Sequence, residues 1–340
     1  MIPSSLPIHA DAPWLAPLAG YTDLPFRLLC RAEGARVACT EMVSAKGLVY
    51  GRRGGKVDSN TLDLLTTRED DMPLVVQLFG AEAEFLAESI RILKDMGFCW
   101  FDLNMGCSVP KVTKTGAGAA MLKDVDNALA VAKAMVQEAG VGRVGFKLRL
   151  GWTPGHEVYA ELAREMEQLG AGWITLHPRY AKQAFGGTAD RGALRTLREQ
   201  LSIPLIASGD LFTAKDAIQC IEETGVDSVM FARGAIASPA VFRFYHGLRA
   251  GNSYSHEYLS AQDLLGMITR HAEWAKELTP GRPGKKGYPP SLLKMRTVVP
   301  RYVKHLPGAR ELRLQLVHCG SWEELDSLLT DFFEGQKALV

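Results

Sequence analysis

Residues 101–112, FDLNMGCSVPKV, place a cysteine at the point where an apolar segment changes into a loop. Most cysteines in globular chains are small buried residues whose thiols take no part in chemistry. Cys107 differs in position, because it follows the apolar run and precedes a segment that Pro110 interrupts. A thiol at such a strand end can face a pocket, so its neighbours in the fold decide whether it has a function.

Eight short apolar segments provide the frame in which Cys107 must lie. Their hydrophobicity is continuous, which predicts strands of a parallel sheet that are buried on both faces. Helical patterns separate them, so that eight βα units within about 240 residues predict a (β/α)8 TIM barrel. A doubly wound open sheet is the competing fold. The second unit is the weakest, because residues 43–70 hold only a poor helical pattern. The segments are residues 13–20, 37–42, 73–80, 99–106, 143–151, 172–178, 203–210 and 227–234.

The carboxyl ends of barrel strands form the active face of such folds. One buried lysine or histidine can be a satisfied core residue, but polar residues recur at these ends, which predicts a pocket. Loops after strands seven and eight commonly hold a phosphate, and the small residues of SGD and ARGA suit that use. Lys147 would then face an electron-rich part of the same ligand. The strand ends are Pro17, Glu41, Gln77, Asn104, Lys147, His177, Ser208 to Asp210, and Arg233 with Gly234.

Composition and charge exclude several classes of protein. The 340 residues carry a net charge of +1, but residues 280–310 hold eight Lys and Arg and no Asp or Glu, which leaves −7 on the rest. A local basic segment of this kind predicts a polyanionic partner, with a plain solvated surface as the alternative. No apolar run reaches 18 residues and the N-terminus lacks a signal-peptide pattern, so we expect no membrane association. The six cysteines show no metal-ligand spacing, which predicts a reducing, cytoplasmic location and no metal.

Seven motifs occur in an order and spacing that resemble one known family. They are APLAGYTDLPFR, VVQLFG, FDLNMGCSVPKV, GFKLRLGW, HPRYAKQAFGGTAD, ASGDL and ARGA. The chain is similar to the tRNA-dihydrouridine synthases over about residues 13–245, and more weakly beyond them. The resemblance implies an enzyme that binds FMN in a barrel and reduces selected uridines of tRNA to 5,6-dihydrouridine with electrons from NADPH.

The resemblance also implies roles for single residues. Cys107 would be the proton donor, and Gln77 would hydrogen-bond the flavin ring. Lys147 and His177 would contact the ring and the phosphate side of FMN. The ring would lie against Pro17, Leu18 and Ala19, and the phosphate would be held by Ser208, Gly209, Asp210, Ala232 and Arg233. The residues expected to contact the RNA substrate are Asn104, Arg179, Lys294 and Arg296.

Three positions depart from the pattern of the family. Ser108 stands where proline usually follows the cysteine, which leaves the shape of this loop open. Ser208 replaces an asparagine and can still hydrogen-bond. Arg191 replaces the tryptophan that usually follows the aspartate of GGTAD.

The implied reaction accounts for a cysteine at this position. Reduction of the uracil C5=C6 bond needs hydride at C6 and a proton at C5. Reduced FMN would supply the hydride, and a protonated thiol would supply the proton from the other face of the base. A uridine in folded tRNA must also be flipped out to reach the flavin. Residues 113–120, TKTGAGAA, have the composition of a mobile loop that closes over substrate, or of a plain connection. The other cysteines that we expect in the core are Cys30, Cys39, Cys99 and Cys220.

Four helical patterns follow the barrel. They predict a smaller all-helical domain at residues 255–340 after a catalytic barrel domain at 1–250. The second pattern, residues 291–306, carries most of the basic segment, and Pro300 is expected to interrupt its helix. We expect this domain to bind tRNA and the protein to be a monomer; a surface for a partner protein is the alternative.

Two other functions compete with this one. A flavoenzyme of the dihydroorotate type would act on a free pyrimidine, but it would not need the basic segment at 280–310. A non-catalytic RNA-binding protein could use a barrel, but it would not bind flavin.

Overall fold

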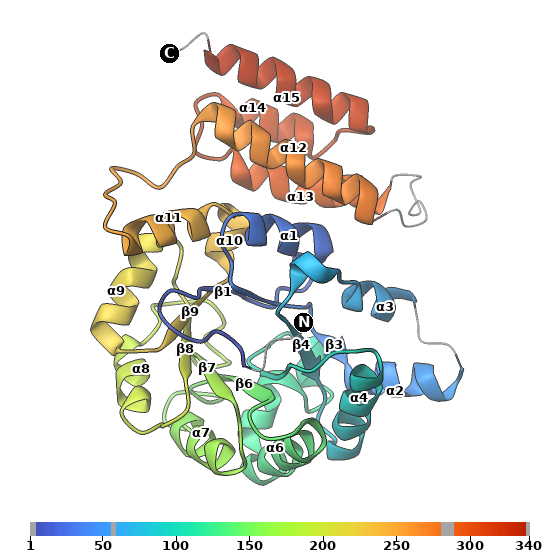
Figure 1. The fold of residues 1–340 in the computed structure, drawn as a ribbon, viewed down its shortest axis with the longest axis vertical. Coiled ribbons are helices and arrows are strands. Elements are labelled where there is room, and N and C mark those ends of the chain that lie inside the picture. Colours follow the sequence, from blue (N-terminus) through green and yellow to red (C-terminus); the bar gives the residue numbers. More distant parts are fainter. Residues whose placement is uncertain (1–4, 56–58, 280–288, 338–340) are drawn as a thin grey trace.

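Eight parallel strands close into a barrel in the computed structural model, which describes residues 5–55, 59–279 and 289–337 (Figure 1). β1 pairs with both β2 and β9, and β2 also pairs with β4, so the sheet has no open edge. The predicted (β/α)8 barrel is therefore confirmed, and the open sheet is excluded. The strands are β1 (Trp14–Leu15), β2 (Val37–Cys39), β4 (Leu74–Phe79), β5 (Phe101–Met105), β6 (Val144–Arg149), β7 (Trp173–His177), β8 (Leu205–Ser208) and β9 (Ser228–Phe231).

Each predicted apolar segment contains one of these strands. Within the segment at 37–42, only Val37–Cys39 form a strand. A separate two-residue strand, β3 (Val43–Ser44), then pairs with the carboxyl end of β4, where Val43 lies opposite Leu78. The weak second unit continues as α2 (Ala45–Arg53), α3 (Ser59–Leu65) and the 3-10 helix η1 (Glu69–Asp71).

Local signals in the sequence set the ends of the other helices around the barrel. α6 begins where the Asp124 carboxylate accepts a hydrogen bond from Asn127 N at 3.0 Å and ends at Gly140, whose φ of 99° suits glycine. α9 begins with a capping box between Thr213 and Asp216. These helices are α1 (Leu24–Ala32), α4 (Ala83–Asp95), α5 (Pro110–Thr113), η2 (Gly118–Lys123), α6 (Val125–Ala139), α7 (Tyr159–Gln168), α8 (Arg191–Arg198), α9 (Ala214–Thr224), α10 (Arg233–Ala237) and α11 (Val241–Arg249).

Three tryptophans fill the half of the barrel interior that lies toward the amino ends of the strands. The rings of Trp14 and Trp173 lie 5.6 Å apart between centroids, and Trp100 lies 6.4 Å from Trp173. Gly145 makes room for them, because a Cβ there would lie 2.0 Å from the Trp173 indole. The bulky apolar layer leaves polar side chains to occupy the layers above it, toward the carboxyl ends of the strands.

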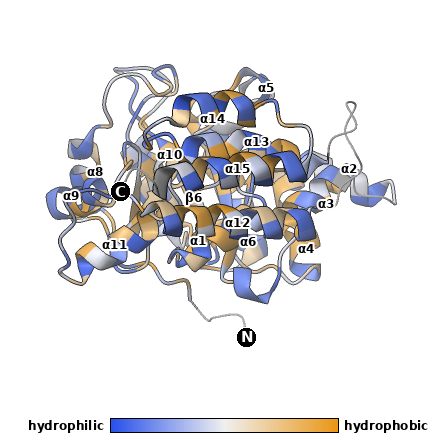
Figure 2. Cartoon of the chain, turned by 90° about the horizontal axis from the view of Figure 1, so that it is seen from above, coloured by the Kyte–Doolittle hydropathy of each residue, from blue (hydrophilic) through white to orange (hydrophobic). Residues whose placement is uncertain are grey.

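Four helices form a cap on one side of the barrel, above α1, α10 and α11 in Figure 1. They are α12 (Ala261–Leu278), α13 (Pro290–Tyr302), α14 (Ala309–Leu316) and α15 (Trp322–Lys337). α12 packs on α1 and α13 packs on α10, and their apolar faces bury Leu264, Ile268 and Met295. Each ribbon alternates between hydrophilic and hydrophobic residues (Figure 2), as expected for helices with one buried face.

Pro300 does not interrupt its helix, contrary to the sequence-based expectation. α13 continues through Pro300 to Tyr302. The proline lies in the last turn, two residues before the helix ends, so that only this final turn has to accommodate its ring. No helix in the described parts of the chain is both long and apolar enough to cross a membrane.

Candidate active site

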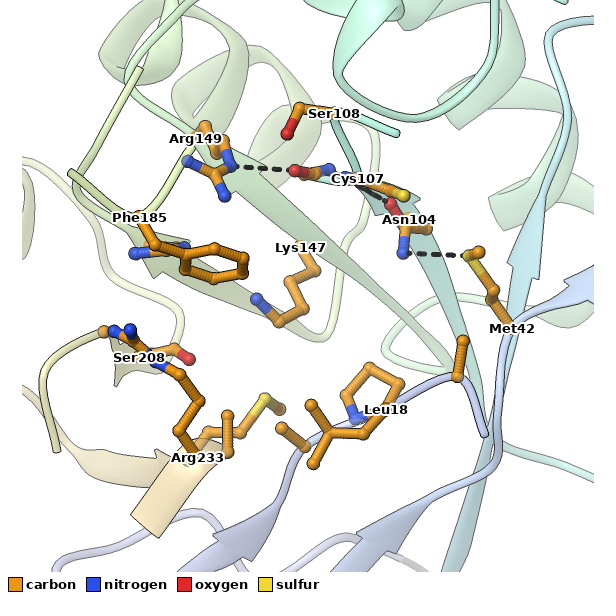
Figure 3. A pocket seen from close by; sticks show the side chains of 18 of the residues that line it. Leu18, Met42, Asn104, Cys107, Ser108, Lys147, Arg149, Phe185, Ser208 and Arg233 are labelled. Atoms are coloured by element: carbon orange, nitrogen blue, oxygen red, sulfur yellow. Dashed lines mark hydrogen bonds between the residues drawn. The ribbon is translucent and has the colours of Figure 1, made fainter. Parts of the chain in front are cut away.

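The carboxyl ends of the strands surround a cavity of about 260 Å³ (Figure 3). Predicted residues from every strand end except that of β2 line it, and Met42 represents that strand instead. The predicted residues that line the cavity are Pro17, Leu18, Ala19, Gln77, Asn104, Cys107, Lys147, His177, Ser208, Gly209, Asp210, Ala232 and Arg233.

The floor of the cavity is a polar layer built by strand register. Gln77 pairs with Asp102 across β4 and β5, and Asn104 pairs with Lys147 across β5 and β6. Alternate residues of a strand point to the same side, so these side chains meet inside the barrel. Gln77 Nε2 donates to Asp102 Oδ2 at 2.7 Å, and Asn104 Nδ2 donates to Gln77 Oε1 at 2.8 Å.

Burial dominates the electrostatics of this layer. It raises the pKa of Asp102 to about 7 and lowers the pKa of Lys147 to about 8, and the attraction between the two groups opposes both shifts. Asp102 Oδ1 has no hydrogen-bond partner among the described residues. The Lys147 side chain extends toward the middle of the cavity (Figure 3), so it presents a positive charge there at neutral pH.

Asn104 also fixes the loop that carries Cys107. Its Oδ1 accepts hydrogen bonds from Gly106 N at 3.1 Å and from Cys107 N at 2.9 Å. From the other side, Ala119 N donates to Cys107 O at 2.9 Å, and Arg149 Nε donates to Gly106 O at 2.8 Å. The thiol is therefore held at the rim of the cavity by side chains and backbone from β5, η2 and β6.

The opposite wall is small and apolar. It is formed by Pro17, Leu18 and Ala19 after β1 and by Met230 and Ala232 at the end of β9. The loop after β1 is held in place because Gly20 N donates to Glu41 Oε2 at 2.5 Å. A flat ring could therefore lie between this wall and the Cys107 rim.

His177 and the end of β8 form a third side of the cavity. Burial, together with the positive charges of Lys147 and Arg149 and of two further arginines, lowers the pKa of His177 to about 2. Its imidazole is therefore neutral at physiological pH. Gly209 packs directly on it, and a Cβ at Gly209 would lie 2.5 Å from His177 Cδ2. The φ of 107° at Gly209 also requires glycine.

Two arginines converge on Asp210 at the same side. Arg179 donates to both carboxylate oxygens, at 2.8 and 2.7 Å, and Arg233 donates to Oδ1 at 3.0 Å. Burial alone would raise the pKa of Asp210, but the hydrogen bonds from Arg179 and Ala189 N and the positive charges of both arginines outweigh it and lower this pKa. The Arg233 guanidinium lies 4.8 Å from the centroid of the Phe185 ring and 4.6 Å from that of Phe212. The corner thus combines an oriented cation with the backbone N–H groups at the ends of β8 and β9.

Comparison with known families decides the relationship of the chain. The sequence model of the family described as "Dihydrouridine synthase (Dus)" matches residues 14–336. The chain belongs to the dihydrouridine synthase family. A "Probable tRNA-dihydrouridine synthase 1" of Synechocystis sp. is 34% identical over 332 residues, which cover 96% of this chain and 87% of that protein. A "tRNA-dihydrouridine synthase B" of Pseudomonas aeruginosa is 33% identical over 302 residues, covering 88% and 86%.

Solved structures of other proteins share the barrel of this chain. An old yellow enzyme homologue from Zymomonas mobilis superimposes with a TM-score of 0.51 at 13% identity, covering 74% of this chain and 94% of that one. Histamine dehydrogenase from Rhizobium sp. 4-9 also gives a TM-score of 0.51 at 13% identity, covering 74% and 47%. At such identities the likeness concerns the fold.

Three of the residues that the sequence assigned to the site lie outside the cavity. Arg179 is buried behind it and orients Asp210. Lys294, on α13, pairs with Asp23 Oδ2 at 3.0 Å and with Glu41 Oε1 at 3.8 Å, so it links the helical cap to the barrel. Arg296 donates to the Val317 carbonyl and lines a separate groove that reaches Arg233.

The sequence analysis did not assign ten of the residues that line the cavity. Those with the larger side chains include Met42, Arg149, Phe185, Phe212 and Met230. A signal was present for Arg149, because it follows Lys147 by two positions and must point to the same side of β6. Phe185 and Phe212 lie in loops after β7 and β8, where no periodic pattern identifies the inward side.

The departures from the family pattern have structural explanations. Pro110, two positions after Ser108, begins α5, and the hydrogen bonds of Asn104 and Ala119 hold the cysteine loop without a proline at 108. Ser208 is buried and lines the cavity. Arg191 begins α8 and donates to Glu223 Oε2 at 2.7 Å, joining α8 to α9.

The other cysteines fall into two groups. Cys30, Cys39, Cys220 and Cys319 are buried. Cys99, which we expected in the core, is only half-buried at the amino ends of β4 and β5, on the opposite side of the barrel from Cys107. No cluster of three or more metal-ligating side chains occurs within the described ranges. Arg282, Lys285 and Lys286 of the basic segment lie outside these ranges.

Proposed function

We propose that this dihydrouridine synthase reduces uridines of tRNA to 5,6-dihydrouridine, with FMN as its cofactor and NADPH as the electron source. The observation that carries the proposal is the position of Cys107 on the same cavity as Lys147, Arg149 and His177. The thiol thus shares one pocket with two cations and a neutral imidazole, which are groups that could bind an electron-rich flavin and a uracil. The names of the relatives support tRNA as the substrate.

The residues of the cavity fit FMN. The apolar wall around Leu18 and Ala232 suits one face of a flat ring, and the Lys147 ammonium suits its electron-rich edge. Gln77 retains one free N–H for the ring, because its other contacts use a single donor and a single lone pair. Arg233 and the backbone at 208–210 suit the phosphate. The Asp210 carboxylate would repel an anion. We therefore propose that its role is to orient the side chains of Arg179 and Arg233, which both donate to it.

When bound and reduced by NADPH, FMN would supply the hydride for C6 of the uracil ring. Cys107 Sγ would release its proton to C5, and the hydrogen bonds to Asn104 Oδ1 hold the backbone of Cys107 at the rim of the cavity. Arg149 is held by three backbone carbonyls and still lines the cavity, so its charge stabilises negative charge that develops on the uracil oxygens. His177 stays neutral and packs against Gly209, and it therefore donates or accepts one hydrogen bond without adding charge.

The helical cap and the adjoining grooves support a large anionic substrate. One groove is lined by Arg233, Arg296, Arg301, Lys304 and Arg313, and no acidic side chain of the described residues lines it with them. A free pyrimidine would not need this surface, whereas phosphate contacts dominate the affinity for nucleic acids. We therefore assign tRNA binding to residues 255–340 and catalysis to the barrel at residues 1–250. We also propose that the protein is a cytoplasmic monomer.

Cys107→Ala tests the proposal. The parent protein should purify yellow with FMN. The variant should keep its FMN and still accept electrons from NADPH, because the thiol is assigned to the proton and not to the cofactor. Reoxidation of the reduced flavin by unmodified tRNA should slow by ~10²–10⁴-fold, the usual contribution of a general acid. Single-turnover absorbance measurements follow both half-reactions.

Cys99→Ala is the matched control. Cys99 precedes β5 whereas Cys107 follows it, so the two cysteines lie at opposite ends of the same strand. Cys99→Ala should reoxidise at nearly the parent rate. A parent protein that cannot be loaded with FMN would contradict the proposed cofactor. Equal reoxidation by Cys107→Ala and the parent would show that another group donates the proton.

A further inference from the structure

Two open grooves continue outward from the active-site cavity. Phe212 lines both the cavity and an outer groove of about 550 Å³, which runs between the start of α9, the segment before α12 and the end of α13. Arg233 lines both the cavity and the basic groove described above, of about 580 Å³. Arg301 and Lys304 line both grooves. A chain that enters the cavity can therefore continue along this surface.

Three aromatic rings lie in a stacked run at the outer groove. Tyr258 stacks on His305 with centroids 4.2 Å apart and planes at 10°, and it contacts His256 at 5.8 Å and 29°. Tyr258 is 53% exposed, and both imidazoles are exposed. Buried aromatic rings usually contribute to a core, but this run faces solvent and joins two segments that are 47 residues apart in sequence.

Cations surround the ring run. Arg301 and Lys304 lie on α13 and just after it, and Lys215 lies at the start of α9. The acidic side chain in this groove, Glu257, is already engaged, because its carboxylate accepts hydrogen bonds from Ala214 N at 2.5 Å and Lys215 N at 2.9 Å. The groove therefore offers flat rings beside cations that can reach a phosphate backbone.

We propose that the run of His256, Tyr258 and His305 is a stacking site for an unpaired base of the RNA substrate, outside the target uridine. The inference rests on the proposed function and adds a second point of recognition. Aromatic rings beside a cationic track are the combination with which proteins bind unpaired nucleotides. One base anchored here, with its phosphates at Arg301 and Lys304, would orient the RNA while the uridine enters the cavity past Phe212.

RNA suits this surface better than the nicotinamide cofactor. The grooves are open and continue beyond the rings, so they have room for a chain that is longer than a dinucleotide. The cations also extend along the basic groove as far as Arg313, which exceeds what one pyrophosphate requires.

Tyr258→Ala, compared with Tyr258→Phe, tests the stacking site. On the FMN-loaded full-length enzyme, the KM and Kd for unmodified tRNA should rise by about 5- to 150-fold in Tyr258→Ala, the range for loss of one base–aromatic stack. The kcat and the rate of flavin reduction by NADPH should stay near the parent values. Tyr258→Phe keeps the ring and should bind as the parent does. Tyr50→Ala removes a ring of similar exposure, 57%, on α2 and should change neither constant.

Chemical probing of the tRNA separates stacking from a general loss of affinity. At saturating enzyme, one unpaired base other than the target should be protected by the parent and by Tyr258→Phe and become reactive with Tyr258→Ala. Unchanged tRNA binding by Tyr258→Ala would overturn the inference. So would a raised KM for NADPH alone, which would indicate a dinucleotide site, or an equal loss in Tyr258→Phe, which would implicate the hydroxyl. A parent enzyme that does not bind tRNA would instead contradict the proposed function.

Discussion

Asp102 and Lys147 lie next to each other in the layer beneath the cavity, and their burial gives this layer a pH dependence. The pKa of Asp102 is raised to about 7, above its value in the unfolded chain. Between about pH 4 and 7 the folded protein therefore holds a proton that the unfolded chain has lost. The free energy of unfolding that this proton contributes is present in full below about pH 4. It decreases as the pH rises and is lost once the pH has passed the folded-state pKa of about 7.

Asp102→Asn should remove this loss of stability. Asparagine keeps the acceptor for Gln77 Nε2 but does not ionise. The flavin-free parent protein should lose about 2–3 kcal/mol of unfolding free energy relative to the variant between pH 5 and 8, since roughly two pH units separate pH 5 from the raised pKa. Lys147 increases the difference. In the variant it lacks the Asp102 counter-ion, so its pKa falls further below that of the unfolded chain. The free energy of unfolding of the variant therefore rises as the pH rises past this pKa. Urea unfolding at both pH values gives the comparison, and parallel pH profiles would contradict the assignment.

The same residues show what a sequence can reveal of a site. Lys147, His177 and Asn104 could be found because they interrupt apolar strands at their carboxyl ends, and the strand period could also have given Arg149. Lys294 could not be placed, since its partners Asp23 and Glu41 are more than 250 positions away in sequence. Its charge was visible, but the ion pair that uses this charge depends on how the cap packs against the barrel.

Among the elements, the strands followed from the sequence and the segment after Cys107 did not. Continuous apolar runs require burial on both faces, which few folds other than a parallel barrel provide. The TKTGAGAA segment, by contrast, has a composition that fits a loop of any kind. Its second half forms part of η2, where residues 117–122 are buried, and Ala119 holds the Cys107 carbonyl. Its small residues thus serve close packing, and only residues 114–116 remain exposed.

Gly118→Ala should therefore disturb the cysteine loop. The φ of Gly118 is +62°, and a Cβ there would lie 2.6 Å from the Cys107 carbonyl oxygen, a backbone atom that cannot move aside alone. We expect a loss of roughly 1–2 kcal/mol of stability from the left-handed conformation. Beyond this, reoxidation of reduced flavin by tRNA should slow at least tenfold, because the thiol is displaced.

Gly116→Ala is the control for backbone strain. Its φ is +79°, but a Cβ there would meet only the Ala81 side chain, at 3.3 Å. It should lose similar stability and keep the reoxidation rate. The two variants are compared by urea unfolding and by single-turnover kinetics. If both slow the reaction equally, strain in the segment matters and the contact with Cys107 does not.

At the scale of the whole molecule, the helical cap and the barrel share a core and a set of polar links. Burial of α12 on α1 means that removal of residues 255–340 would expose apolar surface, so truncation is a poor test of the role of the cap. The polar links are more informative, because they end on the loop after β1 that forms the apolar wall of the cavity. Lys294 binds Asp23 and Glu41, Glu41 in turn holds Gly20 N, and Arg301 donates to the Tyr21 hydroxyl at 2.9 Å.

Lys294→Ala should loosen this wall without touching the cavity. Glu41, whose pKa burial already raises, would lose its cation, and the variant should lose roughly 1–2 kcal/mol of stability, between the values for exposed and fully buried pairs. We expect FMN to dissociate several-fold faster, while Cys107 still donates its proton at the parent rate once flavin is bound. Lys276→Ala is the control, because its partner Asp326 lies within the cap, 3.4 Å away and exposed. Flavin fluorescence on dilution measures release. An unchanged release rate in Lys294→Ala, with tRNA affinity reduced instead, would return Lys294 to the substrate-binding role that the sequence predicted.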